Sequence, residues 1–263
     1  MRSPQSGSDL HPVADTIKKD IQMAIKLTPT APTAPNDNLT GRSHWWGFPD
    51  LPEGVGWPCR KSEEPNNNVG EGPNGGVVEE SNNNVGEGPN GGSEEGEELL
   101  TFVCQVDLAE VAPLDKEGLL PHEGMLWFFA DLDYFLGDTD APCEGTGEWP
   151  QDSFRVIYSP HCSSLHTHEA YWADGTPATL PSEAIVFAPA EESEFGHKLL
   201  GQPAMTEGYE DEDNSRQVSL FQVDEEERWG LRFFDCGLIN FVIDRNDLRS
   251  LRFERARLCL HTL

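Results

Sequence analysis

Three histidines and a cysteine lie close together in the middle of the chain and could ligate a metal. His161, His166 and His168 fall within eight residues, with Cys162 beside the first. Imidazole and thiolate are ligands that zinc and copper prefer, and an extended backbone would place His166 and His168 on one face. Because no second cysteine pair completes a structural site, these residues are weak metal candidates only. The sequence predicts no bound metal and no cofactor.

A second candidate site needs a nucleophile. Cys236 follows Asp235, and His197 could serve as its base. A catalytic thiolate requires a histidine or a cation close by, and the sequence spacing does not bring these three residues together. Cysteine is commonly a small core residue. The sequence therefore leans towards no enzymatic activity, and Cys236, His197 and Asp235 form the catalytic set of the alternative hypothesis.

Two glutamines and two aspartates recur in a repeated pattern. The segment from Phe102 to Asp107 resembles the segment from Ser219 to Asp224, and a glycine-led apolar stretch follows each one. Two interpretations stay open. The polar side chains can bind loop backbones and fix the fold, as most buried polar side chains do. They can also line a groove with tryptophan walls. That groove would comprise Trp57, Gln105, Asp107, Gln222, Asp224 and Trp229.

The elements that must position these residues are mostly strands. Apolar and β-branched stretches between turn-forming residues predict strands at 99–106, 124–130, 154–158, 184–188, 218–223, 237–243 and 253–260. Short helices are expected after Asp107 and Arg245. The tryptophan- and proline-rich segment 44–58 is expected to be irregular and to pack over the sheet. The repeat predicts two pseudo-equivalent sheet halves that share one core.

A helix is predicted before the strands. Apolar residues recur at three- and four-residue steps from Leu10 to Ile25, which is typical of an amphipathic helix. Pro29 and Pro32 would then begin an extended connector. The predicted fold class is therefore α+β, a β-rich single domain with two sheet halves and an N-terminal amphipathic helix. Residues 1–8 are expected to be a disordered tail, and residues 9–263 the domain.

An acidic insertion interrupts that domain. Residues 63–94 contain two copies of one unit, and each copy includes Asn-Asn-Asn-Val-Gly-Glu-Gly-Pro-Asn-Gly-Gly. A unit so poor in apolar residues cannot bury a core. Its glycines match the dinucleotide fingerprint by letter only, because no strand precedes them and no helix follows. We predict that residues 60–98 form a disordered tandem-repeat insertion.

The charge excludes two classes of partner. The 263 residues include 18 Lys and Arg against 47 Asp and Glu, a net charge of −29. Nucleic acid and anionic membranes would repel such a chain. The six scattered cysteines indicate reduced thiols, and no apolar leader opens the chain, so we expect a cytoplasmic protein. A local basic strip near the C-terminus is an expected contact for acidic protein surfaces. It comprises Arg249, Arg252, Arg255 and Arg257.

The order of several motifs resembles the YwqG-like family, a domain of unknown function. The matching stretches are Trp46 to Trp57, Leu100 to Val111, Gly118 to Phe129, His197 to Pro203, Ser219 to Asp224, Trp229–Gly230 with Asp235 to Leu248, and Arg257 to Leu260. One departure is the insertion of Leu231 to Phe234 before Asp235. The resemblance implies a mixed α and β fold built from duplicated sheets, and it implies no established reaction.

We therefore predict an uncharacterised YwqG-like protein that acts as a non-catalytic, cytosolic binding module for a protein or peptide. The alternative is a small hydrolase or ligand-binding enzyme with a Cys/His/Asp site in the central groove. The expected partner is another protein or peptide, and neither nucleic acid nor membrane.

Overall fold

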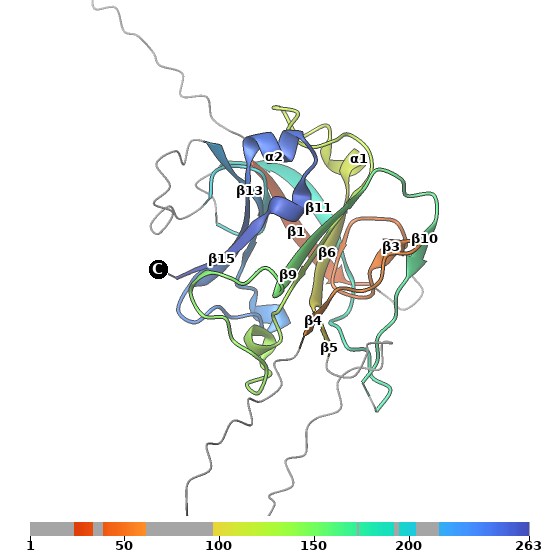
Figure 1. The fold of residues 1–263 in the computed structure, drawn as a ribbon, viewed down its shortest axis with the longest axis vertical. Helices are drawn as coiled ribbons and strands as arrows, with labels where there is room; N and C mark the ends of the chain where they lie inside the picture. Colours follow the sequence, from red (N-terminus) through yellow and green to blue (C-terminus); the bar gives the residue numbers. More distant parts are fainter. Residues whose placement is uncertain are drawn as a thin grey trace, which may run out of the picture.

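The computed structural model describes residues 24–33, 39–61, 97–172, 174–191, 195–203 and 216–262 (Figure 1). Strands dominate these ranges. They are β1 (Ala24–Pro32), β2 (His44–Trp45), β3 (Asp50–Pro52), β4 (Cys59–Lys61), β5 (Glu97–Leu99), β6 (Thr101–Asp107), β7 (Met125–Ala130), β8 (Gly147–Glu148), β9 (Phe154–Ser159), β10 (Leu165–Thr167), β11 (Glu183–Ala190), β12 (Lys198–Leu199), β13 (Gln217–Asp224), β14 (Gly237–Asp244) and β15 (Arg257–Thr262). The helical elements are short: α1 (Leu108–Val111), α2 (Arg245–Arg249), η1 (Tyr134–Leu136), η3 (Glu227–Trp229) and η4 (Phe253–Arg255).

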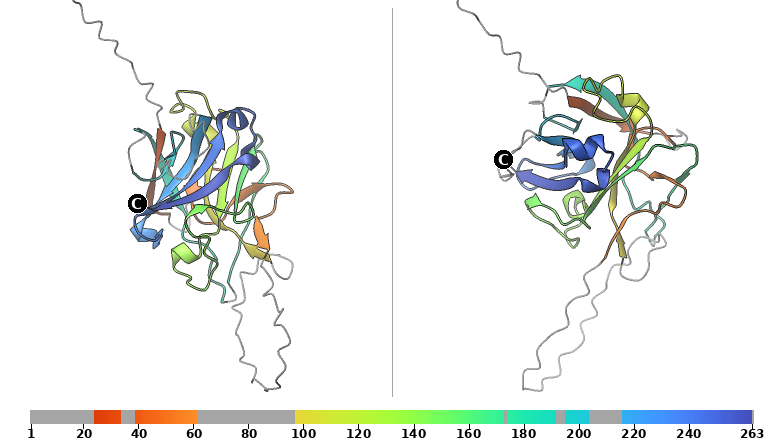
Figure 2. Two further views of the ribbon diagram at one scale, coloured as in Figure 1. Left: turned by 60° about the vertical axis from the view of Figure 1, so that its left-hand side comes forward. Right: turned by 45° about the horizontal axis from the view of Figure 1, so that its top comes forward.

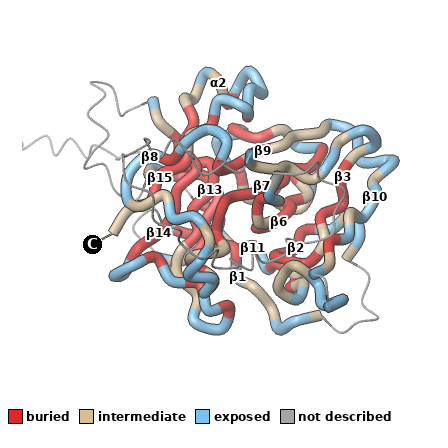
Figure 3. Tube along the Cα trace, turned by 60° about the horizontal axis from the view of Figure 1, so that its bottom comes forward, coloured by how far each residue is buried: buried red, intermediate tan, exposed pale blue. Residues whose placement is uncertain are grey.

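One large antiparallel sheet organises the molecule. Its 11 strands run in the order β8-β15-β14-β13-β12-β1-β11-β2-β6-β7-β9. The sheet curls into a half-barrel, so that strands from its two ends face each other (Figure 2). Two small pairs, β10 with β3 and β4 with β5, lie outside it. The interior of the curl forms the main core, and Figure 3 shows the buried residues gathered along these strands.

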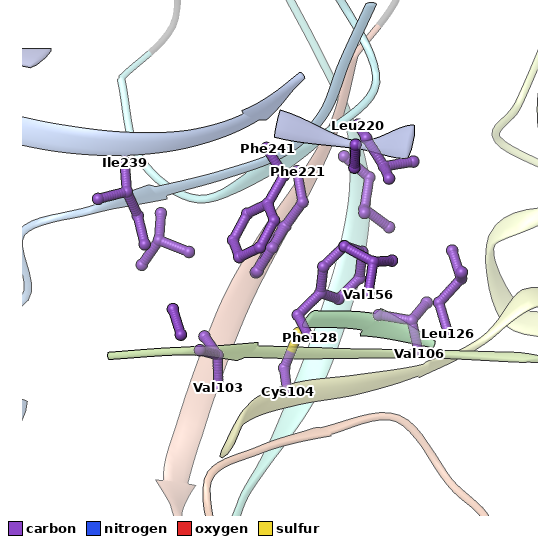
Figure 4. Packing of buried hydrophobic residues seen from close by; sticks show 14 of the residues in the cluster. Val103, Cys104, Val106, Leu126, Phe128, Val156, Leu220, Phe221, Ile239 and Phe241 are labelled. Carbon is purple, nitrogen blue, oxygen red and sulfur yellow. The ribbon is translucent and has the colours of Figure 1, made fainter. Parts of the chain in front are cut away.

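The core is filled by aromatic rings from the two facing ends of the sheet. Phe128 of β7 lies 4.4 Å from Phe221 of β13 and 5.3 Å from Phe241 of β14, measured between ring centroids. Figure 4 shows these rings pointing into the same space. Such tilted and edge-on pairs are the geometries that aromatic quadrupoles favour. A smaller cluster on the outer face of β6 and β7 contains Phe102, Trp127 and other residues that the 51–57 segment covers.

The two hairpins that carry the sequence repeat share their local geometry. In β6–β7, Gln105 pairs with Trp127, and the register shifts between Phe102 and Cys104. In β13–β14, Gln222 pairs with Asn240, and the register shifts between Ser219 and Phe221. Each hairpin therefore has a bulge at the same place in the repeat. A bulge bends its strand and increases the local twist, which helps such a sheet to curl.

The predicted α+β class is wrong, because the described chain is β-rich with only short helices. The two expected sheet halves are continuous with each other, since β11 and β1 join them into one sheet. The last residues of the predicted N-terminal helix, Ala24 and Ile25, lie in β1, and residues 10–23 lie outside the described residues. In β1, Ile25 and Leu27 are buried, whereas Lys26 is partly buried and Thr28 is exposed. Burial of every second residue is the period of a strand.

Other expectations need smaller corrections. Pro29 and Pro32 do not lie in a connector but in β1, where both pair with β11. Strand β12 pairs only with Ile25 and Lys26, so the end of β1 that carries the prolines has no β12 residue beside it. Part of the tryptophan-rich segment is strand, since β2 inserts between β11 and β6. The segment predicted as a strand at 253–260 begins with η4 before β15. The short helices after Asp107 and Arg245 are confirmed, and Asp107 and Asp244 cap them.

None of the helices in the described ranges is long and apolar enough to cross a membrane.

The two ends of the predicted 60–98 insertion pair with each other, Arg60 of β4 lying opposite Glu98 of β5.

Candidate functional site

A cluster of rings and charges lies where β2, β11 and the segment before β12 meet. We call it the tryptophan cluster, and it comprises Trp45, Trp46, Glu183, His197, Arg228 and Trp229. The ring of Trp229 has its centroid 5.0 Å from those of Trp45, Trp46 and His197. Strand β2 supplies Trp45 directly opposite Glu183 of β11, and the 3-10 turn η3 ends at Trp229. Short elements thus bring six residues from distant parts of the chain together.

His197 is held as a neutral ring within this cluster. It stacks on Trp229 with an interplanar angle of 23° and lies 4.8 Å from Trp45. Its Nδ1 accepts a hydrogen bond of 3.1 Å from the backbone N–H of Asp224, which places the single ring proton on Nε2. Burial, reinforced by the charge of Arg228, lowers the pKa of His197 to about 3. A histidine in this state does not exchange protons at neutral pH.

Glu183 is a buried carboxylate paired with a half-exposed cation. Its Oε2 lies 2.9 Å from Nη2 of Arg228, and the Glu183 side chain is 4% exposed against 38% for Arg228. Burial raises the pKa of Glu183, while the nearby Trp229 side chain and the Arg228 charge oppose that rise. The guanidinium also lies over the ring of Trp229, 5.7 Å from its centroid, and Nη1 donates to the Thr30 carbonyl at 2.9 Å.

Three buried donors in the cluster are left unsatisfied. The indole N–H groups of Trp45, Trp46 and Trp229 have no hydrogen-bond partner in the described part of the chain, although all three residues are buried. Buried polar atoms without a partner are uncommon in native proteins. Trp46 also has a positive φ of 50°, which is strained for a bulky residue. Unpaired donors and strain of this kind often occur at functional sites.

The four repeated polar residues contact the chain's own loops. Gln105 is fully buried: its Oε1 accepts from the Asp50 N–H (2.9 Å) and the Trp127 indole (3.2 Å), and its Nε2 donates to the Arg42 carbonyl (3.0 Å) and to Asp50 (2.8 Å). Gln222 makes a single bond of this kind, from Nε2 to the Gly196 carbonyl at 2.8 Å.

The two aspartates follow the same pattern. The N–H of Asp107 donates to the Ser43 hydroxyl at 2.8 Å, and the N–H of Asp224 donates to His197. The carboxylate of Asp107 caps α1, and that of Asp224 accepts the Gly196 N–H at 2.7 Å. These contacts are intramolecular. They join β6 to the loop before β2, and β13 to the loop before β12.

The predicted tryptophan walls lie on different faces of the sheet. Trp57 donates its indole N–H to the Leu100 carbonyl at 2.7 Å and packs beside Phe129 on the outer face. Trp229 belongs to the main core inside the curl. The structure therefore places Trp229, together with His197, in the tryptophan cluster, and places Trp57 elsewhere.

The residues of the catalytic alternative are not in one place. Cys236 is exposed and has a positive φ of 52° in the turn before β14, with Asp235 exposed beside it. His197 is buried between Trp45 and Trp229, and among the described contacts none joins it to Cys236. All six cysteines are thiols and not disulfides.

The weak metal candidates also differ in their surroundings. His161 and His166 are exposed, whereas His168 is partly buried and its N–H donates to the Pro49 carbonyl. Burial and the neighbouring His166 lower the pKa of His168, while Asp50 acts in the opposite direction. Across the described ranges no group of three His, Cys, Asp or Glu residues is arranged to hold a metal ion.

Sequence reasoning missed Glu183 and Arg228. Glu183 is a single acid at the start of an apolar strand, and Arg228 precedes the tryptophan that the groove hypothesis already contained. A charged residue directly before an otherwise apolar strand was the available signal, because a carboxylate buried at that place requires a cation. Nothing in the sequence indicated that Arg228 is this cation.

The fold is that of a β-rich protein with one curled antiparallel sheet and a buried aromatic cluster. A family model described as "Domain of unknown function (DUF1963)" matches residues 43–194 and 167–261. These matches span most of the chain, which therefore belongs to this family. A comparison with curated proteins finds no match.

Proposed function

We propose that the protein is a YwqG-like, non-catalytic module of the cytoplasm that binds a peptide segment of another protein. The observation that supports this best is an exposed aromatic ring and a half-exposed arginine that each lie within two residues, along the chain, of one member of a stacked pair of buried rings. Phe195, 72% exposed, lies two residues before His197, and Arg228 directly precedes Trp229. His197 and Trp229 are stacked on each other.

These residue types favour binding over a purely structural role. Aromatic and arginine side chains supply much of the energy at protein interfaces, above all where rigid neighbours hold them. Phe195 contributes little to the core when it is this exposed. His197 and Trp229 are buried and stacked on each other, so the chain beside Phe195 and Arg228 is anchored before binding, which lowers the entropy lost on binding.

The predicted polar residues have a supporting part in this proposal. Gln105, Asp107, Gln222 and Asp224 position the loops, and Trp229 is the buried ring over which the Arg228 guanidinium lies. The hydrolase alternative has less support, because Nδ1 of His197 already accepts the Asp224 N–H and its ring is deeply buried.

A displayed random-peptide library tests the proposal on the full chain. We expect the wild-type protein to enrich a set of related peptides and Phe195→Ser to lose them. Phe234→Ser is the matched control, because Phe234 is 49% exposed and packs beside Tyr134 and Phe135 instead of the tryptophan cluster. No enrichment with the wild-type protein, or equal enrichment with Phe195→Ser, would contradict the proposal.

A further inference from the structure

One guanidinium in the tryptophan cluster is recognised in three different ways. The group of Arg228 contacts a carboxylate of Glu183, the backbone carbonyl of Thr30 and the face of Trp229, at 2.9, 2.9 and 5.7 Å. The ion pair uses the charge of the guanidinium, and the hydrogen bond to Thr30 uses its fork of N–H donors. The cation–π contact uses its planarity. A lysine ammonium would match the arrangement less well, since its donors converge on one point.

The acceptor side of this arrangement is buried, and the cation is half-exposed. Glu183 is part of β11, is 4% exposed and lies opposite Trp45 in the sheet. Arg228 is 38% exposed and belongs to the three-residue turn η3. Leaving the buried carboxylate without a cation is costly, so Arg228 can leave only when another cation takes its place.

We propose that Glu183, Trp229 and the Thr30 carbonyl form a guanidinium-binding slot, which Arg228 fills in the isolated chain and which an arginine of the partner peptide enters on binding. This inference rests on the proposed function, since it names the anchor residue of the peptide that the module binds.

The surroundings of the slot favour such an exchange. Nε of Arg228 lies 3.7 Å from Oε1 of Glu226, and the next residue, Glu227, is 89% exposed. A displaced Arg228 thus has carboxylates beside it on the solvent side. The net charge of −29 attracts a cationic peptide and speeds its encounter with the chain.

Chemical rescue tests the slot without a partner peptide. Arg228→Ala in the full chain removes the cation and is expected to lower the Tm. Methylguanidinium at about 10 mM should then raise the Tm of this variant by about 2–4 °C and leave that of the wild type nearly unchanged. Methylurea, which has a similar shape and no charge, should not rescue. The double variant Glu183→Gln/Arg228→Ala should lose the rescue, because the buried charge is gone.

Two further variants keep the test decisive. Arg232→Ala removes an exposed arginine that lies 3.7 Å from Glu227, and methylguanidinium should not stabilise it. If Arg228→Ala does not fold, Arg228→Lys retains a cation, and methylguanidinium should raise its Tm more than that of the wild type.

The outcomes separate the two proposals. If methylguanidinium stabilises neither Arg228→Ala nor Arg228→Lys, or if methylurea acts equally well, the slot is overturned even where Phe195-dependent peptides are still selected. If rescue succeeds but the wild-type chain selects no peptide, the proposed function fails, and with it the entry of a partner arginine.

Discussion

At the scale of single residues, the two glutamines of the repeat form different numbers of hydrogen bonds. Gln105 satisfies four polar groups of its neighbours, whereas Gln222 satisfies one carbonyl and leaves its own Oε1 without a hydrogen-bond partner in the described chain. Each group that loses a buried partner costs a desolvation penalty. The same amino acid at matched positions therefore contributes differently to stability.

This difference gives a paired prediction. Gln105→Leu should lower the free energy of unfolding by about 3 kcal/mol, and Gln222→Leu by about 1 kcal/mol. Urea unfolding of both variants and the wild type measures the effect. Equal losses would mean that the hydrogen bonds of Gln105 do not support the 42–50 loop as described.

Asp131 predicts a pH dependence. Nη1 of Arg60 lies 2.6 Å from Asp131 and 2.5 Å from Glu144. Burial raises the pKa of Asp131 to about 6, against the opposing effect of Arg60. Between its ordinary value of 3.8 and about 6 the folded chain holds this proton more tightly than the unfolded chain. Asp131 thus contributes a loss of stability as the pH rises through this window.

The neutral variant Asp131→Asn should remove that contribution. Its free energy of unfolding relative to the wild type should increase by about 2 kcal/mol from pH 4 to pH 7. Urea titrations at both pH values provide the measurement, and Asp152→Asn, an exposed site, is the control. A constant difference across this range would show that the pKa of Asp131 is close to its ordinary value.

At the scale of elements, Gly237 limits how β14 begins. A Cβ at this position would collide with the Phe233 carbonyl and approach the His261 carbonyl at 2.9 Å. Both obstacles are backbone and cannot rotate away. Gly56 offers a contrast, because a Cβ there meets nothing within 4 Å.

Gly237→Ala should therefore lower the free energy of unfolding by about 2–3 kcal/mol. Gly56→Ala should change it by less than about 1 kcal/mol. Thermal and urea unfolding of the two variants compare them directly. If Gly237→Ala were as stable as Gly56→Ala, the tight turn from Phe233 to β14 would be refuted.

Elements were also the scale at which the sequence was most informative. The strands predicted at 124–130, 154–158, 218–223 and 237–243 correspond to β7, β9, β13 and β14, because apolar runs between turn residues are local signals. The two-residue strands β2 and β12 were missed, since so short a segment has no periodicity. The three- and four-residue spacing that ends at Ala24 and Ile25 predicts a helix there, because it competes with the strand period that continues to Leu27.

At the scale of the whole molecule, local patterns do not determine which strands become neighbours. The repeat predicted two halves, but β1 pairs with β11 across more than 150 residues and makes one sheet of them. That pairing also assembles the tryptophan cluster, which gathers residues from 45 to 229. His197 and Trp229 were candidates from the sequence, but their contact with Glu183 and Arg228 depends on the curl of the sheet.

The net charge acts at this scale as well. A chain of −29 attracts cationic peptides over distances of about 10 Å at moderate salt, and the slot would then select arginine at contact. Charge thus provides the attraction, and the geometry of Glu183, Thr30 and Trp229 provides the choice between arginine and other cations.

The most direct test follows the indole N–H signals of the wild-type protein by NMR. The titrants are an arginine tripeptide and the same peptide with citrulline, which keeps the shape and lacks the charge. The account predicts that the Trp229 signal shifts with the arginine peptide and stays in place with the citrulline peptide. A Trp229 signal that moves with neither peptide, or equally with both, would contradict it.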